Sequence, residues 1–234
     1  MYLDWTYIVL VLPCVLLSLY ASARVNSTFK RYSTQRSVRN LTGAQAAERV
    51  LRANGVANVR IERVSGNLTD HYDPKTNVIR LSDNVYANTS TAAIGVACHE
   101  AGHAVQYAEG YGPIRLRAAI IPVTNIGSRL AMPLILAGLL LETLSGVLFN
   151  LVYVGILCFS LSLIFQVVTL PVEFNASSRA LRAISQTGLL NDNEMVGARK
   201  TLRAAAMTYV AATAVSLAQL LRLLMLFGGR RRRD

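Results

Sequence analysis

Four long apolar runs constrain the fold of this chain more than any other feature of its sequence. They cover residues 5–22, 118–141, 147–170 and 204–227. A helix needs about 20 apolar residues to cross the hydrocarbon core of a bilayer, so each run is long enough for one crossing. Hydrophobic residues make up 53% of the chain, and this composition is typical of a multi-pass membrane protein.

The basic excess of the chain fits a membrane better than a nucleic acid. The formal net charge is +11, but the basic residues flank the apolar runs, and the few aromatic residues are not interleaved with them. Basic residues beside spans set topology and attract anionic lipid, whereas a base-stacking surface needs aromatic and basic residues together. We therefore expect a lipid bilayer as a partner and no nucleic acid. The oligomeric state stays open.

The charges around the first run predict its orientation in the cell membrane. Basic residues cluster between positions 24 and 39, and none precedes the run. The positive-inside rule then places the N-terminus outside and the following segment in the cytoplasm. Residues 21–23, Ala-Ser-Ala, resemble a signal-cleavage site, but the order of charges is opposite to that of a secretory signal. We expect residues 1–23 to form a transmembrane anchor.

The segment after the anchor, residues 24–117, is polar enough to face water. Thr42 is expected to cap a helix over 43–54, alternating residues predict a strand over 58–64, and residues 77–82 are expected to form a second strand. The stretch 71–77, which contains Asp-Pro, is expected to break the chain between them. A helix over 91–109, capped by Ser90 or Thr91, completes a small α+β unit.

The rest of the chain completes the predicted fold class, an α+β membrane protein that is mostly helical with about four transmembrane helices. Residues 118–170 are expected to form a transmembrane hairpin, and residues 171–203 a helical segment that Pro171 can begin. Residues 204–234 hold the fourth apolar helix and a basic tail. If that helix crosses, the arginines at 230–233 end outside, against the positive-inside rule. The alternative is an interfacial helix with its basic end on anionic lipid, although length favours crossing.

Within the helix predicted over 91–109, the sequence His99-Glu100-Ala101-Gly102-His103 indicates a metal site. Side chains four residues apart share one face of a helix, so both imidazoles can bind one ion. Glu100 between them can reach a water on that ion and act as its general base. Two of the three histidines of the chain lie here among small apolar residues. A buried ionisable cluster needs a partner, which makes two unrelated histidines the weaker interpretation.

A zinc site of this kind needs a third protein ligand from elsewhere in the chain. The hairpin returns the chain to the membrane side that it left, so Glu173 lies on the same side as His99 and His103 and is our candidate. The alternative is a first-turn glutamate favoured by the helix dipole. Cys98 adjoins the motif but points off another face of the helix, which favours a packed core thiol.

Several stretches of the chain together resemble the YugP-like family of neutral zinc metallopeptidases, which are bacterial membrane proteins. The resemblance covers nearly the whole chain and rests on residues 68–74, 78–82, 96–106 and 170–177. More distantly, the chain is similar to the HtpX-type membrane proteases, whose third zinc ligand is the glutamate of a Glu-x-x-Ala-Asp pattern. That pattern matches Glu173 and Ala176, with Ser177 where the aspartate would be. The resemblance therefore implies Glu173 as the third ligand and leaves the role of the aspartate unassigned.

The motif and the resemblance predict a membrane-embedded zinc endopeptidase of the gluzincin kind, with its active site on the cytoplasmic side. One Zn²⁺ per chain would be held by His99, His103 and Glu173. Glu100 would be the general base, and His71 or Arg179 are candidates for the neighbour that stabilises the oxyanion. The expected substrates are peptides or proteins, possible examples being loose or misfolded membrane proteins.

Two other classes of protein are consistent with parts of the sequence. A non-enzymatic zinc sensor or scaffold would keep the ligands but would not need Glu100. A transporter would need ionisable residues along several spans. The second and third spans offer little beyond Arg129, so we disfavour a transporter.

Overall fold

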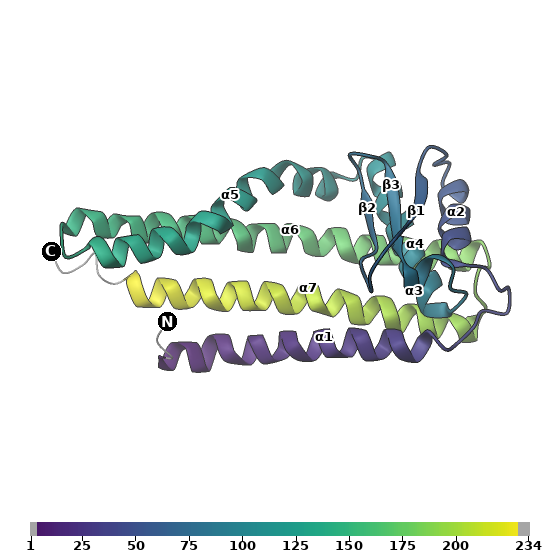
Figure 1. Ribbon diagram of the computed structural model, residues 1–234, viewed down its shortest axis with the longest axis horizontal. Helices are drawn as coiled ribbons and strands as arrows, with labels where there is room; N and C mark the ends of the chain where they lie inside the picture. The colour runs from purple at the N-terminus through teal and green to yellow at the C-terminus, as the bar shows by residue number, and fades with distance from the viewer. Residues whose placement is uncertain (1–3, 229–234) are drawn as a thin grey trace. The chain divides into compact units, whose positions relative to one another are not determined.

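The computed structural model describes residues 4–228, and the arginines at 230–233 lie outside this part of the chain. It has the predicted class, mostly helical with one small sheet (Figure 1). In chain order the elements are a π-helical turn Tyr7–Val11, α1 Leu12–Tyr32, α2 Gly43–Ala53, β1 Arg60–Val64, β2 His71–Asp73, β3 Val78–Ser82, α3 Asp83–Tyr86, α4 Thr91–Ala108, α5 Gly112–Leu141, a 3₁₀ turn Gly146–Phe149, α6 Asn150–Gln186 and α7 Asp192–Phe227.

The chain divides into two compact units. The helical unit comprises residues 1–20, 116–170 and 209–234, and the mixed unit comprises residues 21–115 and 171–208. Several long helices contribute to both units. Within the described part of the chain, four helices are long and apolar enough to cross a membrane, as the sequence predicted. They span Tyr7–Tyr32, Gly112–Leu141, Gly146–Gln186 and Asp192–Phe227.

The helical unit has the surface of a protein that lies in lipid. Large apolar side chains stay exposed, among them Leu140 at 74% and Leu157 at 66%. Inside the unit, α5 and α6 approach closely because Gly155 offers no side chain: a Cβ there would lie 2.8 Å from the carbonyl oxygen of Ala131. Small residues at such crossings let membrane helices pack without a hydrophobic driving force.

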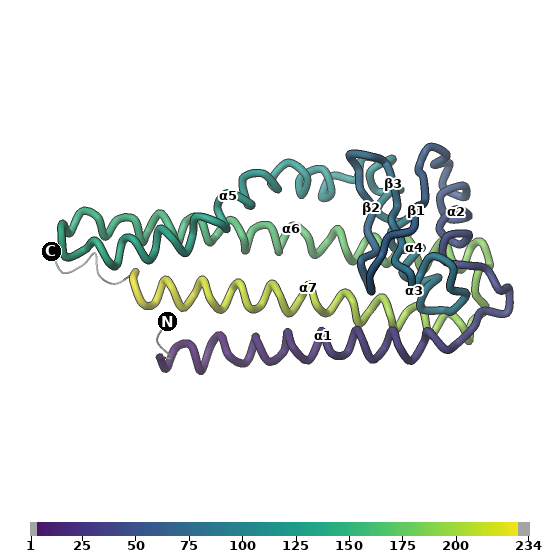
Figure 2. The backbone as a smooth tube through the Cα atoms, in the orientation of Figure 1, coloured from purple at the N-terminus to yellow at the C-terminus, as the bar shows by residue number. Residues whose placement is uncertain are grey.

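The mixed unit is built around a three-stranded sheet with the order β1-β3-β2 (Figure 2). The central strand β3 runs parallel to β1 and antiparallel to β2. Its side chains Ile79 and Leu81 are fully buried. They join a core formed with small residues of α4 such as Ala97 and Ala101. The sheet and α4 therefore share one hydrophobic core, which fixes α4 in place.

Local sequence explains where α2 begins and ends. Thr42 and Gln45 form a capping box, in which each side chain accepts a hydrogen bond from the other residue's backbone N–H. After the helix, Gly55 adopts a φ of +70°, a conformation that costs glycine little. The helix buries Ala46 and Ala47 completely and packs on α4. The predicted cap and helix are both confirmed.

Three expectations about elements were wrong. The stretch 71–77 begins with strand β2, whose three residues are too few to show an alternating pattern. Pro171 does not begin a helix but lies inside α6. A proline inside a helix removes one backbone hydrogen bond, and long apolar helices tolerate this loss because neighbouring groups satisfy the freed carbonyl. The expected boundary between the helical segment 171–203 and the fourth apolar run does not separate two helices, because α7 continues from Asp192 to Phe227.

Candidate metal centre

Helix α4 presents the two histidines of the motif side by side. Ser90 caps the helix, with its hydroxyl oxygen accepting a hydrogen bond from the N–H of Ala93 at 3.2 Å. The rings of His99 and His103 meet edge to face, with centroids 4.7 Å apart. This is the arrangement expected for residues one helical turn apart. Both side chains are largely buried, with exposed fractions of 14% and 9%.

Helix α6 brings Glu173 to the same two rings. Its Oε2 lies 3.3 Å from Nε2 of His99 and 3.5 Å from Nε2 of His103. The approach of α6 to α4 depends on Gly102, where a Cβ would lie only 2.8 Å from the carbonyl oxygen of Ala176. The close packing at Gly102 therefore lets a residue 74 positions after His99 in the chain reach the motif.

The three side chains form a donor set that fits zinc. Among the described residues, His99, His103 and Glu173 are the group that could hold a metal ion, with ligand atoms within 4.8 Å of one another. Two imidazole nitrogens and a carboxylate oxygen are typical zinc ligands, and a site with three protein ligands leaves a position open. Burial alone would lower the pKa of His103, but its hydrogen bond to Glu173 and the charges of Glu100 and Glu173 raise it. The site thus has an excess of negative charge, which favours a cation.

Glu100 and Cys98 occupy different positions relative to this cluster. Glu100 lies on α4 between the two histidines and is 8% exposed, and its charge acts on His103. Cys98 is fully buried in the core of the mixed unit. Burial raises the pKa of its thiol, so that the thiolate needed for metal binding is disfavoured. Its position agrees with the prediction of a packed core thiol.

Two residues that the sequence did not identify contact the far nitrogens of the two rings. The side-chain oxygen of Gln106 lies 3.0 Å from Nδ1 of His103, and the hydroxyl of Ser177 lies 3.1 Å from Nδ1 of His99. Ser177 stands where the HtpX-type pattern has its aspartate, and this match was the sequence signal that could have identified Ser177 as a site residue. Gln106 follows His103 by three residues, a spacing that also places them on one helix face.

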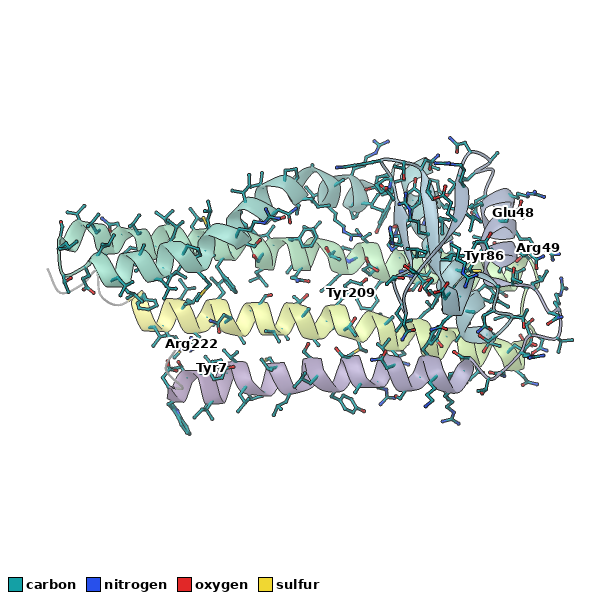
Figure 3. All side chains as sticks on the ribbon, viewed as in Figure 1. Tyr7, Glu48, Arg49, Tyr86, Tyr209 and Arg222 are labelled. Atoms are coloured by element: carbon teal, nitrogen blue, oxygen red, sulfur yellow. The ribbon has the colours of Figure 1, made fainter. Side chains whose placement is uncertain are left out.

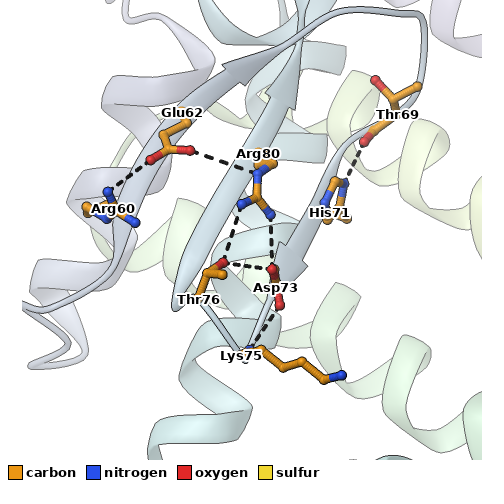
Figure 4. Close-up of polar contacts among 8 residues, drawn as sticks. All are labelled: Arg60, Glu62, Thr69, His71, Asp73, Lys75, Thr76 and Arg80. Carbon is orange, nitrogen blue, oxygen red and sulfur yellow. Dashed lines mark hydrogen bonds and ion pairs between the residues drawn. The ribbon is translucent and has the colours of Figure 1, made fainter. Parts of the chain in front are cut away.

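The remaining candidates, His71 and Arg179, do not join the cluster. His71 lies exposed on β2, and its Nδ1 donates a hydrogen bond to the carbonyl oxygen of Thr69 at 2.8 Å (Figure 4). Arg179 lies on α6, where it donates to Asn175 and pairs with Glu109, each at 2.7 Å. Its guanidinium is therefore already engaged by protein groups.

Strand β2 offers an edge of the sheet next to α4. Within residues 4–228 it pairs with β3 on one side and has no strand partner on the other, and it contacts α4. The ring of Tyr72 on β2 packs against that of Tyr107 on α4, with centroids 5.6 Å apart. An edge strand of this kind carries unpaired backbone groups that can bind an extended peptide.

Known proteins are similar to this chain over most of its length. The family model described as "Putative neutral zinc metallopeptidase" matches residues 7–228 of the chain. The chain is 48% identical over 221 residues to a Bacillus subtilis (strain 168) protein named "Putative membrane protease YugP". This match covers 94% of the chain and 96% of the relative. No solved structure matches the chain.

Proposed function

Because the chain belongs to this family of neutral zinc metallopeptidases, we propose that it is a membrane-embedded endopeptidase that hydrolyses peptide bonds with one bound Zn²⁺. The observation that carries the proposal is the convergence of His99 and His103 from α4 with Glu173 from α6. A buried carboxylate between two imidazoles is costly to maintain unless a cation balances it. The description of the family names zinc, and zinc is an ion that this donor set suits.

Each residue of the site has a proposed role in the reaction. When bound, zinc supplies a Lewis acid that makes water nucleophilic near neutral pH. Glu100 accepts the proton of the attacking water and later donates it to the leaving amine. His99, His103 and Glu173 would hold the ion. Of the two candidates for stabilising the oxyanion, His71 remains available on the edge strand, whereas Arg179 is engaged by Asn175 and Glu109.

The edge of β2 is the proposed site for the substrate backbone. An extended peptide can add to this edge as a further strand, so that main-chain hydrogen bonds provide affinity without a strict sequence requirement. His71 and Tyr72 would then lie beside the bound chain. Because Glu173 follows the apolar run 147–170 directly, we propose that the substrates are loose or misfolded membrane proteins, cut on the cytoplasmic side.

The test of this proposal compares the wild type with Glu100→Gln in detergent. We expect one zinc per chain in both proteins by elemental mass spectrometry, and cleavage of unfolded casein by the wild type alone. Loss of a general base costs about 10²–10⁴-fold in rate. Glu48→Gln is the matched control, since Glu48 is exposed on α2 and pairs with Arg52 in the next helical turn.

Two other outcomes would redirect the proposal. Equal casein cleavage by the wild type and Glu100→Gln would remove Glu100 from the mechanism. One zinc in both proteins, with a cellular phenotype that Glu100→Gln leaves unaltered, would favour a zinc sensor or scaffold. A sensor or scaffold would keep the zinc ligands and would not need Glu100 as a general base.

A further inference from the structure

We propose that Gln106 is a positioning residue that holds a proton of His103 on Nδ1, so that Nε2 is the nitrogen that faces the metal. This inference rests on the proposed zinc site. Gln106 lies outside the His99–His103 motif, and it contacts Nδ1 of His103, not the Nε2 atom that faces the cluster.

The contacts of His103 separate the two nitrogens of its ring. Nε2 faces the carboxylate of Glu173 at 3.5 Å, and Nδ1 faces the side-chain oxygen of Gln106 at 3.0 Å. A neutral imidazole carries its proton on one nitrogen and a lone pair on the other. Only the tautomer with the proton on Nδ1 lets Nε2 act as a ligand, so the partner of Nδ1 decides whether His103 is ready to bind.

The orientation of the Gln106 amide is fixed by acceptors on α6. Gln106 is fully buried. Its nitrogen donates to the carbonyl oxygen of Val172 and to Oδ1 of Asn175, each at 2.9 Å. A backbone carbonyl can only accept, so this end of the amide must be the NH₂ group. The other end is then the oxygen, which can only accept the proton of Nδ1.

The orientation of Asn175 is fixed in the same way by Arg179. The guanidinium nitrogen Nε of Arg179 donates to Oδ1 of Asn175 at 2.7 Å. Arginine has no acceptor and stays protonated, so the atom of Asn175 that faces it must be its oxygen. The ion pair with Glu109 at 2.7 Å holds Arg179 in place. One series of hydrogen bonds with a single allowed direction thus runs from Arg179 through Asn175 and Gln106 to His103.

The contact of His99 lacks this direction. Its Nδ1 faces the hydroxyl of Ser177, and a hydroxyl can donate as well as accept. Ser177 therefore accommodates either tautomer of His99. The two proposed histidine ligands therefore differ. Neighbouring groups hold a proton of His103 on Nδ1, whereas the contact of His99 with Ser177 allows the proton of His99 on either ring nitrogen.

The tautomer can be read directly because the chain has only three histidines. The probe is ¹⁵N-histidine in the metal-free, full-length protein, with each ring assigned by its loss in a His→Gln variant. We expect His103 to carry its proton on Nδ1 in the wild type and to lose this preference in Gln106→Met. Ser177→Ala, which touches the other ring, should leave His103 unchanged.

Zinc affinity, measured by competition with a chromophoric chelator, provides the second readout. Outer-shell partners of this kind are worth about 10–100-fold in metal affinity, and we expect a loss of that size in Gln106→Met. Gln35→Met is the control for stability, because Gln35 bonds Thr91 at the start of α4, away from the ligands. Should Gln106→Met fail to fold, Arg179→Met removes the donor at the other end of the series and should also weaken the preference.

The outcomes separate this proposal from the proposed function. An unchanged His103 tautomer in these variants, with zinc affinity within about twofold of the wild type, would overturn the role of Gln106 and leave the peptidase intact. If the wild type has the expected tautomer but binds no zinc, the proposed zinc peptidase fails and the effect of Gln106 on His103 stands.

Discussion

The carboxylate of Glu173 joins helix α6 to both histidines, and it is the proposed ligand whose removal tests the metal centre best. In Glu173→Ala the two imidazoles remain on one helix face, but the negative charge between them is lost. We expect zinc affinity to fall by more than about 100-fold, because even outer-shell partners are worth 10–100-fold. The measurement is zinc per chain after dialysis against a chelator, with Glu48→Ala as the control. Full occupancy of the variant would exclude Glu173 as a ligand.

At the scale of residues, the sequence indicates the centre of the candidate site more clearly than its surroundings. His99 and His103 are a local pattern, since their spacing alone puts them on one helix face. The structure also brings Glu173 to them, as the order of segments along the chain suggested. Gln106 could not be identified in this way. A glutamine three residues after a histidine is common on helices, and its function depends on Val172 and Asn175 of a distant helix.

Packing between α4 and α6 sets the geometry of the site at the scale of elements. In Gly102→Ala the new Cβ meets the backbone of Ala176 at 2.8 Å, which cannot yield as a flexible side chain would. We expect the helices to separate slightly near Glu173, and zinc affinity to fall about tenfold or more, as for lost outer-shell contacts. The measurement is the chelator competition.

The control for this variant lies on the same helix. Gly95 packs against Ala198 of α7, where a Cβ would lie at 3.2 Å. Gly95→Ala should therefore change the melting temperature of the protein and leave zinc affinity intact. An equal loss of affinity in both variants would mean that α4 responds as a whole and not through its contact with Ala176.

A network of charges holds the strands of the sheet together. Arg80 on the central strand contacts Asp73 on β2 at 3.1 Å and Glu62 on β1 at 3.9 Å (Figure 4). Asp73 also accepts hydrogen bonds from the hydroxyl of Thr76 and the N–H of Lys75. These bonds, with that to Thr76 foremost, lower the pKa of Asp73 to about 2. The charged carboxylate therefore stabilises the turn between β2 and β3.

The lowered pKa of Asp73 gives this stabilisation a definite pH dependence. A carboxyl group with a depressed folded-state pKa contributes stability above its unfolded pKa of about 3.9, and the contribution disappears as pH falls toward the folded value. We expect Asp73→Asn to melt at a lower temperature than the wild type at pH 7, with a smaller difference at pH 3. A difference that stays constant between the two pH values would show that the charge of Asp73 is not the cause.

Sequence patterns identified elements where the local signal was strong. The cap at Thr42 and the alternation that predicted β1 depend on neighbouring residues, so these predictions were close. Strand β2 was missed because three residues show no periodicity, and it exists through its pairing with β3. The continuity of α6 through Pro171 was also missed, because the local rule places proline at helix starts, whereas long apolar helices tolerate an internal proline.

At the scale of the whole molecule, an ion pair connects the two ends of the chain within the helical unit. Asp4 precedes the first span, and Arg222 lies near the end of α7, with 2.6 Å between the carboxylate and the guanidinium. Arg222 also lies over the ring of Tyr7 (Figure 3). A charge inside an apolar unit is costly unless it is paired. The two ends of the chain should therefore lie on one side of the membrane, which requires an even number of crossings.

This ion pair predicts that the fourth apolar helix crosses the membrane, a question that the basic tail left open in the sequence. In a variant without native cysteines, a cysteine at position 234 should react with a membrane-impermeant reagent added outside intact cells. Cysteine at Glu142, in the turn after α5, should react likewise, and cysteine at Glu48 should be protected until the cells are opened. Protection at 234 with reaction at 142 would instead mean that α7 ends in the cytoplasm, since the positive-inside rule would then prevail over the pairing of Asp4 with Arg222.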